Sequence, residues 1–167
     1  MAFMSLPFDF WKKVNQNQAA KNRQYKRLLQ SLQAIQPGSV LLLRNPSDEP
    51  WLGQLLKRGQ LFCKARLKSF RGSGKRCHQN ASCIWIMEQG LIATGFAYNT
   101  VSPGSTGAWY RHSWGLDYSS EIPRIIETTY KFKNYYGVKL DDEECKCFVL
   151  QNVLPMVEAL IEKINAG

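Results

Sequence analysis

The chain has 167 residues, a formal net charge of +9 at pH 7, and 44% hydrophobic and 12% aromatic residues. This length suits one domain over residues 1–167, and the composition is that of a globular protein that buries a core, which excludes a disordered chain. The positive charge points to an acidic partner: nucleic acid, an anionic membrane surface or an acidic protein.

The chain contains five cysteines, an odd number, and its first residues lack the long apolar run of a signal peptide. We therefore expect free thiols in a reducing cytoplasm, although a protein delivered into another cell has the same features. No apolar stretch approaches the roughly 20 residues of a membrane span, so we expect no membrane contact.

The first part of the chain reads as helical. Apolar residues recur at helical spacing over 11–35 and predict one amphipathic helix, which the Pro-Gly pair at 37–38 ends. A short buried run follows at 40–43. The next segment, NPSDEP, predicts a turn that starts a second helix with Ser47 or Asp48 as its cap. The pattern over 60–70 is ambiguous.

The second part begins with a basic, glycine-bearing loop that leads to a helix over 77–87, which Gly90 is expected to end. Strands are expected at 91–100, 108–117, 122–132 and 135–140. A C-terminal helix follows, capped by Asp141 or Asp142 and broken or restarted at Pro155.

This order of elements predicts an α+β fold. The helix that begins at Cys77 should pack on an antiparallel sheet of three to five strands, because short loops join strands that pair antiparallel. Helices should flank this core at both ends of the chain.

Cys77 lies where that helix begins, a position that favours a thiolate. Lys75 and Arg76 add positive charge beside it, which also lowers the pKa expected for a thiol. The backbone N–H of Cys77 and those of the preceding loop are candidate oxyanion donors. Asn80, one turn into the helix, is expected to donate from its side chain or to hold the loop.

His112 and Glu127 lie on consecutive expected strands. Strand alternation places His112 on the same face as Tyr110 and Trp114. Glu127 interrupts an apolar run, and a buried carboxylate is costly unless it is paired. A ring N–H of His112 would pair it and turn the other ring nitrogen toward a thiol, so we predict a site of Cys77, His112 and Glu127.

Each of these residues alone has an ordinary structural reading. Cys77 is then an inert thiol, His112 a core histidine, and Glu127 a partner for Arg124 or Lys131.

His78 is a rival base. Adjacent helical residues point in different directions, however, so we expect His78, together with Arg76 and Trp114, to support the site.

Zinc and nucleotide sites are disfavoured. Cys145 and Cys147 with Cys77 and His78 supply zinc-type ligands, but the Cys-x-Cys spacing on a helix turns the two thiols apart. The loop RGSGKR matches neither nucleotide fingerprint. Basic residues near aromatic ones are only a weak signal for RNA. We therefore expect no metal and no cofactor.

The segments RCHQNASCIW, GLIATGFAY, WYRHSWGL and IIETTYKFKNYYGVKL resemble a group of uncharacterised bacterial proteins over residues 75–140. More distantly, the layout resembles papain-like cysteine hydrolases, including deamidase effectors, and transglutaminase-like proteins. The resemblance implies Cys77 as nucleophile, His112 as general base and Glu127 as orienting acid. The chain departs from the papain pattern because it lacks a Gly-x-Cys-Trp signature and has Glu where Asn or Asp is commoner.

The residues and the resemblance together predict a thiol hydrolase, either a glutamine deamidase or a cysteine peptidase, in the manner of a bacterial effector or toxin. Its substrate would be a protein or peptide, acidic in character. The alternatives are a basic non-catalytic module that binds nucleic acid or an acidic protein, and a transglutaminase-like acyltransferase. We expect the chain to consist of a helical segment over 1–38, a catalytic core over 39–140 and a C-terminal helix over 141–167.

Overall fold

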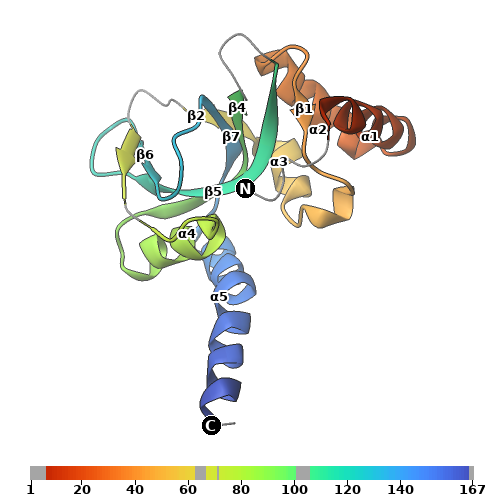
Figure 1. Ribbon diagram of the computed structural model, residues 1–167. Helices are drawn as coiled ribbons and strands as arrows, with labels where there is room; N and C mark the ends of the chain where they lie inside the picture. Colours follow the sequence, from red (N-terminus) through yellow and green to blue (C-terminus); the bar gives the residue numbers. More distant parts are fainter. Residues whose placement is uncertain (1–6, 63–66, 71, 101–105, 166–167) are drawn as a thin grey trace. The chain divides into compact units, whose positions relative to one another are not determined.

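The computed structural model describes residues 7–62, 67–70, 72–100 and 106–165 (Figure 1). Within them the chain forms an α+β fold of five α-helices and a mixed sheet. The contacts cluster in two compact units. Unit 1 comprises 1–62, 95–111 and 132–138, and unit 2 comprises 63–94, 112–131 and 139–167. Strands β4 (Leu91–Thr100) and β5 (Gly107–Asp117) contribute residues to both units.

Unit 1 begins with two helices, α1 (Phe8–Lys21) and α2 (Arg23–Ile35). The prediction of a single helix over 11–35 is wrong, because Asn22 leaves the helical conformation with φ −133° and ψ 113°. Its side-chain oxygen accepts the backbone N–H of Tyr25 at 3.0 Å, so Asn22 caps a new helix. The predicted stop after Ile35 is confirmed.

The remainder of unit 1 contains η2 (Pro46–Asp48), α3 (Leu52–Arg58) and several strands. The prediction that Ser47 or Asp48 caps α3 is wrong, because Trp51 occupies its N-cap position, where no side chain makes a capping hydrogen bond. Strand β1 (Val40–Leu41) runs parallel to β5, and β2 (Gln60–Phe62) runs antiparallel to β7 (Asn134–Lys139).

The core of unit 1 includes a buried polar group, Asn15. Its amide donates to the hydroxyl of Tyr25 and to the carbonyl of Leu41, both at 2.8 Å, and its oxygen accepts the N–H of Leu41 at 2.8 Å. These bonds tie α1 to α2 and β1, and they satisfy polar atoms that burial would otherwise penalise.

Unit 2 combines α4 (Cys77–Ile86), α5 (Asp142–Asn165) and short strands. Its strand order is β4-β5-β6-β3, where β6 is Arg124–Glu127 and β3 is Leu67–Ser69. The predicted antiparallel pairing of β5 with β6 is confirmed, whereas β3 runs parallel to β6. The fourth predicted strand, β7, does not follow β6 in the meander, because it lies between β2 and β4 in the sheet.

Gly90 allows a close approach to β5 in unit 2. Helix α4 already ends at Ile86, and Glu88 lies in the left-handed region at φ 57°. The prediction that Gly90 ends the helix is therefore wrong. A Cβ at Gly90 would lie 2.4 Å from the carbonyl oxygen of Leu116. Glycine is therefore required there by the neighbouring strand and not by the helix end.

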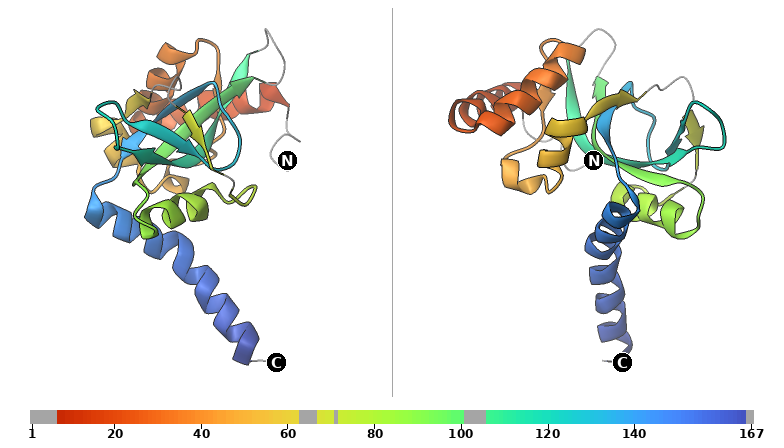
Figure 2. Two further views of the ribbon diagram at one scale, coloured as in Figure 1. Left: turned by 90° about the vertical axis from the view of Figure 1, so that its left-hand side faces the viewer. Right: turned by 180° about the vertical axis from the view of Figure 1, so that it is seen from behind.

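Helix α5 begins with a reciprocal cap. A carboxylate oxygen of Asp141 accepts the N–H of Glu144 at 2.9 Å, and the Glu144 carboxylate accepts the N–H of Asp141 at 3.0 Å. The predicted break at Pro155 is wrong, since α5 continues through it. Only Cys145 and Phe148 of α5 are buried; its first turns pack on α4 and the rest runs on past it (Figures 1 and 2).

Among the described residues, no helix has the length and apolar character needed to cross a membrane.

Helix α4 packs on β5 through Gly115. A Cβ on Gly115 would lie 2.7 Å from Cδ1 of Ile84 and 3.0 Å from Cβ of Ile126. We expect Gly115→Ala to destabilise the protein by about 1–3 kcal/mol through overpacking, measured by denaturant unfolding. Gly53→Ala is the control: nothing lies within 4 Å of a Cβ there, so this helical site should gain about 0.5–1 kcal/mol. Equal effects of the two changes would contradict this packing.

Candidate active site

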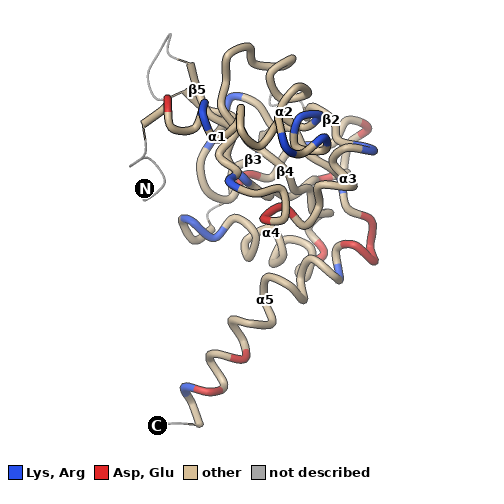
Figure 3. Tube along the Cα trace, turned by 90° about the vertical axis from the view of Figure 1, so that its right-hand side faces the viewer, with Lys and Arg blue, Asp and Glu red and all other residues tan. Residues whose placement is uncertain are grey.

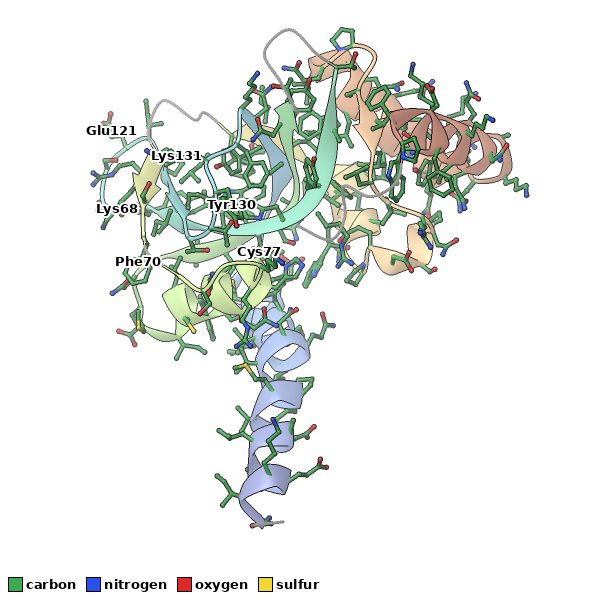
Figure 4. The ribbon with its side chains drawn as sticks, in the orientation of Figure 1. Lys68, Phe70, Cys77, Glu121, Tyr130 and Lys131 are labelled. Atoms are coloured by element: carbon green, nitrogen blue, oxygen red, sulfur yellow. The ribbon has the colours of Figure 1, made fainter. Side chains whose placement is uncertain are left out.

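Cys77 is the first residue of α4 (Figure 4). The N-cap residue, Arg76, has φ −120° and ψ 42° and makes no side-chain cap. Two residues before Cys77, Lys75 adopts φ 64°, a left-handed conformation that a non-glycine residue rarely takes. Such strained turns persist only where surrounding contacts hold them, and they cluster at functional sites.

The loop before Cys77 is held by Asn80 from within α4. The Asn80 amide donates to the carbonyl of Ser73 at 2.8 Å, and its oxygen accepts the N–H of Ser73 at 3.2 Å. A Cβ at Gly72 would lie 2.5 Å from Nδ2 of Asn80 and 2.9 Å from the carbonyl oxygen of Thr128. Asn80 thus serves the loop, the second of the two roles expected for it.

His112 and Glu127 form a buried pair in unit 2. Nε2 of His112 lies 2.9 Å from Oε2 and 3.2 Å from Oε1 of Glu127, and both residues are 3% exposed. A hydrogen bond also joins the ring of His112 to the Cys77 side chain. Because Glu127 engages Nε2, the nitrogen available to the thiol is Nδ1. The structure thus brings together the three residues that the sequence singled out.

Glu127 is itself held in place by the residues that follow it. Its Oε1 accepts the N–H groups of Thr128 and Thr129 at 2.9 and 2.8 Å, and the hydroxyl of Thr129 at 3.0 Å. These donors stabilise the charged carboxylate where burial alone would penalise it. They also fix the direction in which its other oxygen meets His112.

The electrostatics of the pair favour a thiolate beside an imidazolium. Burial raises the pKa of Cys77, but the hydrogen bond and charge of His112, with the N–H groups of Ser113 and His78, outweigh it, so that the pKa lies below its usual value. Burial lowers the pKa of His112, but hydrogen bonds and charge from Cys77 and Glu127 outweigh it and raise that pKa to about 9. Each group therefore stabilises the charged form of the other.

His78 lies beside this pair in a second hydrogen-bonded chain. Its Nδ1 is 2.7 Å from Oγ of Ser113, and that hydroxyl donates to Oγ1 of Thr94 at 2.8 Å. His78 thus ties α4 to β5 at the residue whose N–H meets the thiol. The geometry gives His78 a supporting place, as the sequence predicted, and assigns the contact with Cys77 to His112.

The other two residues expected to support the site are Trp114 and Arg76. Trp114 is fully buried and stacks on the ring of His112, with ring centroids 6.0 Å apart. Arg76 extends toward α5, where Nη1 lies 3.9 Å from Sδ of Met156. The pKa of Cys77 is lowered by His112 and backbone N–H groups, whereas we expected Lys75 and Arg76 to contribute.

Sequence reasoning missed Ser113, Thr94, Thr129 and Gly72. The Thr-Thr pair directly after Glu127 was a usable signal, since such residues offer both backbone and hydroxyl donors to a preceding carboxylate. The partnership of Ser113 with Thr94 had no sequence signal, because it depends on the alignment of β5 with β4.

The geometry does not assemble the zinc-type ligands considered from the sequence. Cys145 is buried and Cys147 exposed, so the two thiols point apart. Among the described residues, no group of three or more His, Cys, Asp or Glu side chains is placed to hold a metal ion.

Comparison of the chain with known proteins found no matching family model, curated protein or solved structure.

The paired pKa shifts predict how Cys77 reacts with iodoacetamide across pH. Reaction should begin well below the usual thiol range, because the thiolate exists above the lowered pKa of Cys77. In His112→Ala the contribution of the imidazole is lost, while burial and the N–H groups of Ser113 and His78 remain, so the midpoint should rise above that of the wild type. Mass spectrometry of each cysteine measures this, with exposed Cys83 and Cys147 as internal controls. An unchanged midpoint in His112→Ala would contradict the pairing.

The contact of His78 with Ser113 predicts a different response. His78→Ala should slow alkylation of Cys77 roughly fivefold, since a lost hydrogen bond contributes about 1 kcal/mol, and leave the pH midpoint in place. His78→Asn, whose amide can donate near the position of Nδ1, should recover most of the rate. A shift of the midpoint in His78→Ala would instead identify His78 as the base.

Proposed function

We propose that this protein is a thiol hydrolase that cleaves an amide, as a glutamine deamidase or a cysteine peptidase. The observation that supports it is the continuous chain of contacts from the Cys77 thiol through His112 to the buried, fixed carboxylate of Glu127. A nucleophile, a base and a group that orients the base are the three parts of such a site.

In the first half of the reaction, the Cys77 thiolate attacks the carbonyl carbon of the substrate. His112, protonated on Nδ1, gives its proton to the departing nitrogen, so the C–N bond breaks and a thioester remains on Cys77. Glu127 keeps the opposite nitrogen, Nε2, protonated and stabilises the imidazolium before that transfer. The leaving group is ammonia for a deamidase or an amine for a peptidase.

In the second half, water attacks the thioester while Nδ1 of His112 accepts a proton from it. The C–S bond breaks, the acid product leaves, and the proton returns the site to its thiolate–imidazolium state. Negative charge develops on the carbonyl oxygen in both halves. The N–H groups at the start of a helix point along its axis, away from the carbonyls of later turns, so those at the start of α4 are suited to stabilise that charge.

Two exposed aromatic side chains suit a peptide substrate. Phe70 follows β3 and Tyr130 follows the segment that holds Glu127, and both are marked with Cys77 in Figure 4. Their segments run together, since Phe70 donates its N–H to the carbonyl of Glu127 at 2.8 Å and Gly72 donates to that of Thr128 at 3.2 Å. We propose that they contact side chains flanking the target amide.

We also propose that unit 2 has a papain-like or transglutaminase-like fold. A nucleophile at the start of a helix, a base on a following strand and an acid on the next give the layout of papain-like and transglutaminase-like proteins. The order of elements in unit 2 supports this likeness, whereas the parallel pairing of β3 with β6 departs from the antiparallel sheet expected from the sequence.

The test is amide hydrolysis by the full chain on a library of glutamine-containing peptides, with ammonia release and peptide mass as readouts. Cys77→Ala should abolish turnover, and Glu127→Gln, which keeps the size but loses the charge, should lower kcat between about a hundredfold and ten-thousandfold. Cys83→Ala, which removes an exposed thiol on the same helix, is the matched control and should retain activity.

The same assay separates the alternatives. Turnover that appears only when a primary amine is added, with a new amide as product, would assign the site to acyl transfer. Turnover retained in Cys77→Ala would overturn the proposal. If no peptide is turned over while nucleic acid binds with strong salt dependence, the protein is instead a basic binding module.

A further inference from the structure

An exposed apolar stripe runs along α5 from Leu150 to Ile164, mostly in the C-terminal half of the helix. Seven of its side chains are between 40% and 69% exposed, far from the nearly complete burial of Cys145 and Phe148 in its first turns. They are Leu150, Leu154, Met156, Val157, Leu160, Ile161 and Ile164. An exposed apolar surface of this extent marks an interaction site more often than a free surface.

The spacing of this stripe is that of a helix facing another helix. Leu150, Val157 and Ile164 recur every seven residues, and Val153 and Leu160 lie between them at the second position of the same heptads. Side chains at these two heptad positions meet those of the facing helix in a coiled coil. β-Branched residues at the first position with leucine at the second favour two parallel strands, which Val157, Ile164 and Leu160 provide.

This half of α5 is poorly suited to stand alone. A helical segment of this length is marginal in water, and Pro155 within it removes a backbone hydrogen bond and destabilises it further. Pro155 lies on the side of the helix opposite the heptad positions, where it does not obstruct a facing helix. Packing of a partner against the apolar stripe would supply the stabilisation that this segment lacks on its own.

The charges on the helix narrow the choice of partner. Charged positions are few along this half of α5 (Figure 3): Glu158, Glu162 and Lys163. A helix that lies on an anionic membrane is rich in Lys and Arg, which this one is not. Residues that flank a coiled-coil seam select a partner by charge. In a parallel pair of identical helices the flanks would bring Val149 to Leu154 and Met156 to Ile161, which are all apolar, and Lys163 is the single charged flanking residue. Two copies of this helix therefore meet without opposing like charges along the seam.

We propose that the C-terminal half of α5 pairs in parallel with the same helix of a second copy of this chain. The seam from Leu150 to Ile164 is only about 21 Å long at 1.5 Å per residue, so the dimer should be weak and concentration-dependent. The proposal does not rest on the proposed function, and Cys77→Ala should dimerise like the wild-type protein.

The first test is sedimentation equilibrium of the full chain from about 1 to about 200 µM, concentrations that bracket a weak dimer. The wild type should shift from monomer to dimer across this range. The double variant Val157→Glu/Leu160→Glu should stay monomeric, whereas Ala159→Glu, an exposed residue of the same turn outside the seam, should dimerise as the wild type does. Unchanged alkylation of Cys77 in each variant shows that the fold is retained.

The second test reports orientation. In a parallel pair, Ile164→Cys places two thiols face to face, so mild oxidation should give a disulfide-linked dimer. Ala159→Cys, which carries the same native cysteines, should not. A wild type that stays monomeric at all concentrations overturns the proposal, as does a seam variant that dimerises normally. If the monomer instead sediments with phosphatidylserine vesicles, the stripe is a membrane contact and the proposal is wrong.

Discussion

The site in unit 2 depends on one buried carboxylate. Glu127 accepts two backbone N–H groups and a hydroxyl on one oxygen and presents the other to His112. These donors stabilise the charged form of the carboxylate, which burial alone would disfavour. Glu127 holds the imidazole in position and, together with Cys77, raises the pKa of His112, and His112 in turn lowers the pKa of Cys77.

Packing places these charges within reach of one another. Helix α4 approaches β5 because Gly115 leaves room for Ile84, and the hydrogen bond of His78 to Ser113 fixes the first turn of that helix against the strand. Asn80 closes the preceding loop onto the same turn. Neutral contacts thus hold the nucleophile and the base close together, and Cys77, His112 and Glu127 stabilise one another's charged forms.

Much of the site could be predicted from local signals. Cys77 at a helix start and a carboxylate in an apolar run are both visible without tertiary structure, since each breaks a pattern that burial would otherwise impose. The alternation along β5 also placed His112 and Trp114 on one face, as their stacked rings confirm. The catalytic role of these residues stays a prediction that activity measurements decide.

The sequence by itself determined where α4, β4 and β7 lie and that Asp141 caps α5, because capping groups and apolar periodicity act over a few neighbouring residues. Only the tertiary structure decided that β3 runs parallel to β6, that β7 pairs with β2, and that α5 continues through Pro155. Strand partners are chosen by hydrogen bonds between residues far apart in the chain, which no local pattern encodes. The contact of Ser113 with Thr94 belongs to the same class, since strand alignment creates it.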